Sequence, residues 1–126
     1  MKALGQIKWA ISGGHIPLRS NGAEPAFTSR DYLSILNTSD EEEKVSIDIY
    51  FEASKQFGPY EINIKARRMR KIRINDLIDP LPIPLDTGYG AVVSSSHNII
   101  VQFSRMDTSH THNTGFTTTP FSQNNN

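Results

Sequence analysis

The chain contains no cysteine, carries no net charge and has no long apolar run. The absence of cysteine excludes a disulfide framework and thiolate chemistry, and it is compatible with a reducing compartment. Because 13 basic residues balance 13 acidic ones, attraction to a polyanion must come from local charge. No apolar stretch reaches the roughly 18 residues of a membrane-spanning helix, and the first residues lack the apolar segment of a signal peptide. We therefore expect a cytoplasmic protein.

Alternating hydrophobicity is the main pattern that the sequence does contain. Val45, Ile47 and Ile49 alternate with polar residues, which is typical of a strand with one buried face. The pattern recurs at 60–66, and weaker apolar strands are expected at 8–11, 32–36, 70–74, 91–94 and 99–103. No window shows helical periodicity. Seven or more short strands with little helix predict an all-β fold, an antiparallel, jelly-roll-like β-sandwich.

The composition changes after Asp107, where polar residues replace the alternating apolar ones. Such a segment buries too little apolar area to offset the entropy lost on ordering. We therefore expect residues 1–107 to form the binding domain and residues 108–126 a polar, flexible tail. Phe116 and Phe121 are either loosely attached or docked onto the domain or a neighbouring molecule.

Two long connections, 12–29 and 75–90, separate the expected strands. In compact domains, loops of this length are usually functional or disordered. The second contains Pro80, Pro82 and Pro84, which stiffen the backbone and favour an ordered loop that can hold a site. Within the first connection we interpret Ser12–His15 as a tight turn.

The densest charge lies between positions 65 and 73, where six of nine residues are basic. These residues are Lys65, Arg67, Arg68, Arg70, Lys71 and Arg73. We interpret 60–74 as a hairpin turning near Arg67-Arg68, which gives Arg68 and Arg70 the inward parity of Ile72. A half-buried guanidinium needs a carboxylate or a ligand anion, so the run either contacts a ligand or is paired internally to organise loops. The neutral net charge makes nucleic acid an unfavoured partner.

The histidines and carboxylates predict neither a metal site nor a catalytic centre. His110 and His112 are close in sequence, yet no cysteine or patterned carboxylates complete a tetrahedral set, so we expect no metal and no cofactor. No nucleophile elbow is present, and no catalytic residue is assigned. Asp76 and Asp79 could act as acid and base, although Asp beside Asn and Pro more often bonds loop amides.

Trp9 is the only tryptophan and lies within an expected strand. We expect it to anchor the core, because it buries a large area; if it were exposed, it would favour stacking on a sugar. Planar hydrogen-bonding groups beside an aromatic ring suit a carbohydrate, because its hydroxyls both donate and accept. The residues with such groups are Arg67, Asn75, Asp76 and Gln102.

A series of short motifs runs in order from position 9 to position 107. They are Trp9-Ala10-Ile11, Gly14-His15-Ile16-Pro17, Glu24-Pro25, Ile35-Leu36-Asn37, Gly58-Pro59-Tyr60, Ala66-Arg67-Arg68, Arg73-Ile74-Asn75-Asp76-Leu77, Asp79-Pro80, Ile83-Pro84, Ile99-Ile100-Val101-Gln102 and Arg105-Met106-Asp107. In their order and spacing these motifs resemble the sensory rhodopsin transducer family. The chain differs at His97-Asn98, where a proline-containing turn is usual, and in its polar tail.

The resemblance implies a small soluble β-sandwich that assembles into a homotetramer and couples a microbial sensory rhodopsin to a cytoplasmic response. It also implies likeness to sandwiches that bind small molecules or carbohydrates. The matching polar residues, which are candidates for binding or for locking loops, are Glu24, Arg67, Arg68, Asn75, Asp76, Gln102, Arg105 and Asp107. With Trp9 they form the candidate ligand site.

Three functional hypotheses follow. The first is a non-enzymatic cytoplasmic signalling protein that binds a polar small molecule, a carbohydrate being one class, as a homotetramer. The second is a ligand-free adaptor that binds a membrane sensory rhodopsin or another receptor. The third is an enzyme acting on carbohydrate through Asp76, Asp79 or Glu24. This enzyme and a DNA-binding regulator are less favoured than the first two hypotheses.

Overall fold

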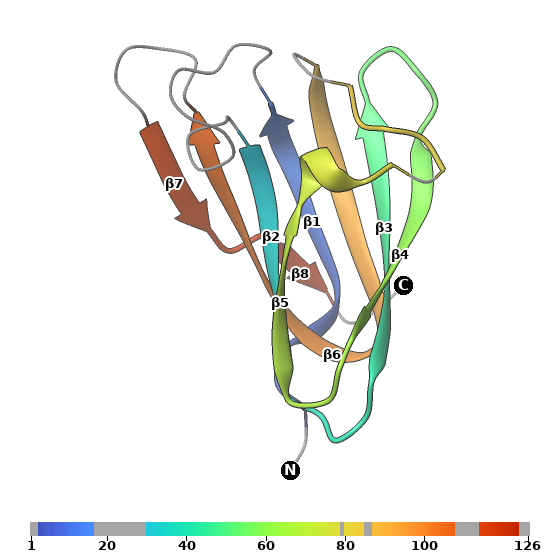
Figure 1. Ribbon diagram of the computed structural model, residues 1–126, viewed down its shortest axis with the longest axis vertical. Helices are drawn as coiled ribbons and strands as arrows, with labels where there is room; N and C mark the ends of the chain where they lie inside the picture. The colour runs from blue at the N-terminus through green and yellow to red at the C-terminus, as the bar shows by residue number, and fades with distance from the viewer. Residues whose placement is uncertain (1–2, 17–29, 79, 85–86, 108–113, 124–126) are drawn as a thin grey trace.

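The computed structural model describes residues 3–16, 30–78, 80–84, 87–107 and 114–123. These residues form eight strands and one short 3₁₀ helix (Figure 1). The elements are β1 (Gln6–His15), β2 (Arg30–Asn37), β3 (Glu43–Phe51), β4 (Phe57–Ile64), β5 (Arg68–Arg73), η1 (Ile74–Asp76), β6 (Gly88–Asp107), β7 (Thr114–Thr118) and β8 (Phe121–Gln123). The predicted all-β fold with little helix is confirmed. No helix in the described segments is long and apolar enough to cross a membrane.

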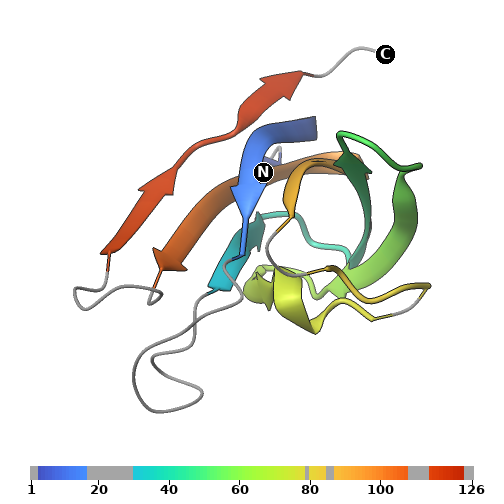
Figure 2. The same ribbon diagram turned by 90° about the horizontal axis from the view of Figure 1, so that it is seen from above.

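The strands form two antiparallel sheets that share the long strand β6 (Figure 2). In the first sheet the order is β4-β3-β6-β1-β8; in the second, β6 lies between β2 and β7, and β5 pairs with β2. Ile99 of β6 still pairs with β1, whereas Ile100 pairs with β2. Strand β6 therefore crosses from one sheet to the other. The sequence predicts two separate strands here, because the polar residues that bend the strand interrupt the apolar alternation.

The core lies between the two sheets and follows the alternating pattern. Val45, Ile47 and Ile49 of β3 are fully buried, as predicted. Trp9 is 6% exposed, and its indole Nε1 donates to the carbonyl oxygens of Gln6 and Ile99, both at 3.1 Å. The prediction that Trp9 anchors the core is confirmed. Its burial also removes it from any sugar-stacking role.

The basic run does not form a hairpin. Strand β4 pairs with β3 and strand β5 pairs with β2, so the turn at Arg67 leads from the first sheet to the second. Ile72 and Ile74 face the core as predicted, but Arg68 and Arg70 are exposed. The predicted half-burial of these two guanidiniums is wrong, because the inner side of β5 opens to solvent between the edges of β4 and β5.

Part of the polar segment after Asp107 is regular structure. Strand β7 pairs with β6, and strand β8 pairs with β1. The Ser104 and Thr117 hydroxyls lie 2.9 Å apart, within hydrogen-bonding distance. Strand pairing uses backbone groups, so a polar segment can complete a sheet without burying much apolar area. The expectation of a flexible tail does not describe β7 and β8; residues 108–113 and 124–126 lie outside the described residues.

The proline-containing connection is attached to the first sheet. The Tyr60 hydroxyl of β4 donates a hydrogen bond to the carbonyl oxygen of Leu81, and Ile83 is buried in the core. The Leu81 side chain itself remains 49% exposed. The Ile83 side chain thus attaches this loop to the core, and Leu85 lies outside the described residues.

Candidate functional site

The structure does not bring the predicted Arg-Arg and Asn-Asp groups together. Arg67 and Arg68 lie at one end of β5, whereas Asn75 and Asp76 lie in η1 at the other end (Figure 1). At about 3.3 Å per residue, the six-residue strand separates them by roughly 20 Å. The predicted cluster is therefore wrong as a single site, since residues near in sequence move apart along an extended strand.

Arg67 organises loops. Its guanidinium pairs with Asp40 through Nη2 and through Nε, which lies 2.7 Å from Oδ1. Its backbone N–H donates to the carbonyl oxygen of Ser39 at 3.1 Å. These bonds attach the β4–β5 turn to the β2–β3 loop. For Arg67, the structure therefore shows the internal pairing that the sequence analysis gave as the alternative to ligand contact.

The other predicted residues are dispersed. Gln102 is exposed on the outer face of the second sheet, opposite Ser34. Asp107 is the last residue of β6, and Glu24 and Asp79 lie outside the described residues. Among the described candidates, Arg105 has a side chain that belongs to a buried polar network.

That network is centred on Asp31, which has no solvent exposure. Its Oδ1 accepts a hydrogen bond from Arg105 Nε at 3.0 Å, and its Oδ2 accepts from the Tyr89 hydroxyl at 2.7 Å and the His15 backbone N–H at 2.9 Å. Arg105 Nη2 also donates to the carbonyl oxygen of Gly13 at 2.7 Å. One carboxylate thus connects β2 with β1 and with both ends of β6.

Burial raises the pKa of Tyr89, and the neighbouring Asp31 carboxylate raises it further. Tyr89 therefore remains protonated at neutral pH and donates to Asp31. The sequence analysis did not identify either residue as part of a site. Asp31 carried a usable signal, because it has the inward parity of Leu33 and Ile35, and a carboxylate on a buried face requires partners.

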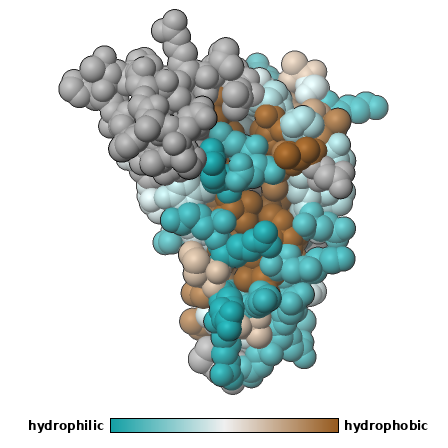
Figure 3. Space-filling model, in the orientation of Figure 1, coloured by the Kyte–Doolittle hydropathy of each residue, from teal (hydrophilic) through white to brown (hydrophobic). Residues whose placement is uncertain are grey.

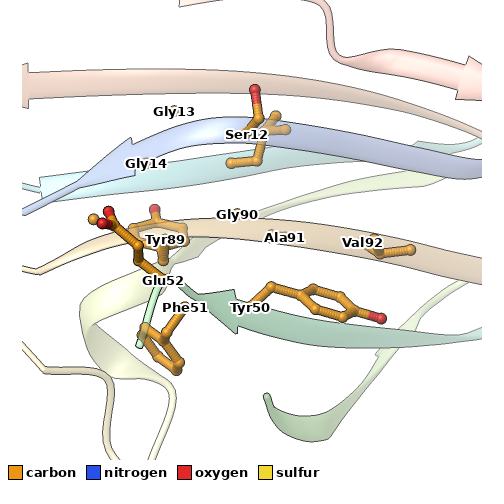
Figure 4. A pocket seen from close by; sticks show the side chains of 12 residues that line it. Ser12, Gly13, Gly14, Tyr50, Phe51, Glu52, Tyr89, Gly90, Ala91 and Val92 are labelled. Carbon is orange, nitrogen blue, oxygen red and sulfur yellow. The ribbon is translucent and has the colours of Figure 1, made fainter. Parts of the chain in front are cut away.

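A pocket of about 570 Å³ lies beside this network, where β1, β3 and β6 meet. Figure 4 shows Ser12 of β1 on one side of the β6 segment 89–92. Tyr50 of β3 and Glu52, which follows β3, lie on the other. The lining residues are Ile11, Ser12, Gly13, Gly14, Tyr50, Phe51, Glu52, Gly88, Tyr89, Gly90, Ala91 and Val92. Segment 12–15 belongs to β1, with a register irregularity between Ile11 and Gly14, so the predicted tight turn is wrong.

The Asp31 network fixes two parts of the pocket wall. Tyr89 lines the pocket and is held through its hydroxyl, and Gly13 is held through its carbonyl oxygen. The Tyr89 ring lies against Gly14, where a Cβ atom would come within 2.2 Å of the ring. Only glycine allows this close approach of ring and backbone.

The pocket has the size and groups of a small-molecule site. Its volume lies within the range of ligand clefts, about 300–1,000 Å³. It offers the 44% exposed Tyr50 ring, the Ser12 hydroxyl and the Glu52 carboxylate. Among the described residues no group of three or more His, Cys, Asp or Glu side chains is placed to hold a metal ion.

A second buried carboxylate, Glu43, lies near the bend of β6. Its Oε1 accepts from the Ser96 hydroxyl at 2.7 Å and from the backbone N–H groups of Ser96 and His97 at 2.8 and 3.1 Å. Its Oε2 lies 2.8 Å from His97 Nδ1. Burial alone would raise the pKa of Glu43, but the hydrogen bonds from Ser96 and His97 outweigh it and the pKa is lowered.

Comparison with known proteins supports the family expected from the motifs. The sequence model of the Anabaena sensory rhodopsin transducer family matches residues 4–122. The solved structure of the Anabaena sensory rhodopsin transducer is 43% identical, covers 82% of this chain and 99% of its own, and superposes with a TM-score of 0.75. A crystal structure of Thermotoga maritima 1070 is 31% identical, covers 97% of this chain and 98% of its own, and gives a TM-score of 0.81. No curated protein matches the chain. The chain belongs to the Anabaena sensory rhodopsin transducer family.

Proposed function

We propose that the chain is a non-enzymatic signalling protein that binds a polar small molecule in the pocket beside Tyr89. The observation that carries the proposal is the attachment of the pocket wall to a buried ion pair. Asp31 and Arg105 hold Tyr89 and Gly13 in place before any ligand arrives. A preformed wall lowers the ordering cost of binding, which is a property of small-molecule sites.

The chemistry of the pocket favours a carbohydrate. A sugar presents apolar C–H faces and hydroxyls that both donate and accept hydrogen bonds. The Tyr50 ring can cover such a face, the Glu52 carboxylate accepts from hydroxyls, and the Ser12 hydroxyl does both. At Gly13 a Cβ atom would have no neighbour within 4 Å, so the backbone there is open to close approach by a ligand.

The proposal includes a cytoplasmic homotetramer. The outer face of the first sheet carries two exposed rings, Tyr50 at 44% and Phe121 at 71%, with Ala10 and Val92 between them. Such a face supports association through sheet faces. Light scattering of a Phe121→Glu variant, which places a charge on this face, is expected to show a smaller assembly than the unaltered protein. If the mass of the assembly is unchanged, this face does not take part in the association.

The second candidate is a ligand-free adaptor for a membrane sensory rhodopsin or another receptor. The name of the 43% identical relative, a sensory rhodopsin transducer, favours it. The two candidates differ in one measurable respect. An adaptor of this kind should bind its receptor when no small molecule is present. Substitutions of the pocket residues should not abolish that binding.

A thermal-shift screen against sugars, sugar phosphates and nucleotides tests the first candidate. A ligand present at 100 times its Kd stabilises the native state by about 2.7 kcal/mol. We expect a shift with a sugar that is reduced in Tyr50→Ala and Glu52→Gln. The matched control, Glu42→Gln, removes an exposed carboxylate from the β2–β3 loop and should retain the shift. The absence of a shift across the panel would favour the adaptor.

A further inference from the structure

A second hollow lies at the opposite end of the molecule from the Tyr89 pocket. It has a volume of about 310 Å³ and lies between the end of β4 and the start of β5. Its lining residues are Asn63, Ile64, Lys65, Arg68, Met69 and Arg70. Three of these six are cations and none is an acid, so the hollow is a local concentration of positive charge on a chain of zero net charge.

Two of the acids on adjoining strands and loops are paired with other cations, whereas Glu41 and Glu42 are exposed on the β2–β3 loop. Asp40 is paired with Arg67, and Glu61 is 3.5 Å from Lys44 Nζ. Within the described part of the chain, no ion pair involves Lys65, Arg68 or Arg70. Three like charges around one hollow repel each other, and this repulsion is relieved when an anion enters.

One of the three cations is already oriented. Arg70 Nη1 donates to the carbonyl oxygen of Asn63 at 3.1 Å, which connects the edge of β5 with the edge of β4. This bond fixes the guanidinium at the hollow and leaves its other N–H groups available. A guanidinium presents N–H donors in a planar fork that matches two oxygens of a phosphate, and Lys65 adds a point charge.

We propose that this hollow binds a phosphate group, with Arg68 and Arg70 as the main donors. Two sources of that group fit the surroundings. A soluble phosphate would use the hollow alone. A lipid headgroup would also use the exposed Met69 and Leu36, which pair across β5 and β2 and are 54% and 37% exposed. Figure 3 shows mainly hydrophilic residues over the lower part of the face that carries β5.

Titration of the full chain with pyrophosphate at low ionic strength, followed by amide NMR, tests the proposal. We expect the largest shift changes at residues 63–70 and an affinity that falls as salt is added. Arg68→Gln should weaken binding about tenfold, because it removes a charge-assisted contact. Lys55→Gln, which removes an exposed charge at the β3–β4 loop, is the matched control and should bind as the unaltered chain does.

Vesicles identify the source of the phosphate. Co-sedimentation is measured with phosphatidylcholine vesicles, with and without phosphatidylglycerol. Binding to the anionic vesicles that is lost in Arg68→Gln supports a lipid headgroup, and pyrophosphate binding without vesicle binding supports a soluble phosphate. The proposal is overturned if neither probe binds, or if Lys55→Gln weakens binding as much as Arg68→Gln. Because Arg68 is exposed, its variant should fold, and a thermal melt checks this.

Discussion

Arg105 on β6 and Asp31 on β2 form an ion pair in which Nε lies 3.0 Å from Oδ1. The Asp31 side chain has no solvent exposure, and the Arg105 side chain is only 21% exposed. A carboxylate buried in this way depends on its counter-charge, because water cannot solvate it. The pair therefore contributes to the stability of the domain and holds Tyr89 and Gly13 in the pocket wall.

Replacing Arg105 with Met should destabilise the fold strongly. The substitution leaves the Asp31 charge buried without its cation, which typically costs about 3–5 kcal/mol. Urea denaturation measures the change in the free energy of unfolding. Arg68→Met is the control, since an exposed residue should alter stability by no more than about 0.5 kcal/mol. Equal stability of the two variants would show that Asp31 does not need the Arg105 charge.

Adjacent glycines give a matched pair of variants. A Cβ atom at Gly14 would lie 2.2 Å from the Tyr89 ring, whereas one at Gly13 would have no atom within 4 Å. Gly14→Ala should displace Tyr89 and lower the free energy of unfolding by about 1–3 kcal/mol. It should also weaken the binding of any ligand in the pocket. Gly13→Ala should have little effect on stability. Similar melting temperatures for the two variants would contradict the observed contact.

Acid should destabilise the protein partly through Glu43. The lowered pKa of Glu43 means that the unfolded chain takes up this proton more readily than the folded chain. The resulting stability is present above the ordinary pKa of 4.5 and is lost as the pH falls through the lower folded value. Unfolding free energies measured from neutral pH to about pH 3 should show this loss.

The variant Glu43→Gln should flatten that acid dependence. It should also lower stability at neutral pH by about 1–3 kcal/mol, because an amide group would face the Ser96 and His97 donors. Glu42→Gln, at the exposed neighbouring position, should keep the acid dependence of the unaltered chain. If the two variants respond to acid alike, Glu43 is not the group responsible.

Arg67 should affect local stability and not pocket binding. It has a φ of +54°, and its ion pair with Asp40 is largely exposed, at 75% and 66%. Exposed pairs contribute about 0–1 kcal/mol, so Arg67→Ala should cause a small loss in melting temperature. Arg67→Gly should be more stable than Arg67→Ala by about 1 kcal/mol, because glycine adopts this backbone conformation without strain.

The same Arg67 variants separate the two ends of the molecule. Because Arg67 lies away from the Tyr89 pocket, both variants should keep a ligand-induced thermal shift. If Arg67→Ala abolishes that shift, the ligand binds near the β4–β5 turn and the proposed pocket is not its site.

The sequence by itself determined the strands and the core faces of this protein. Period-two alternation is a local property of an extended chain, so it located the buried face of β3 and the inward residues Ile72 and Ile74. The large apolar area of Trp9 likewise placed it in the core. The family motifs, read in order, identified the relationship that the comparisons confirm.

Only the tertiary structure decided which strands pair and which side chains meet. The sequence did not show that β4 and β5 join different sheets or that β6 crosses between them, because strand pairing depends on contacts far along the chain. Asp31 meets Tyr89 and Arg105 across separations of 58 and 74 residues. Local patterns carry no information on such distant contacts, and the candidate site therefore emerged from the fold.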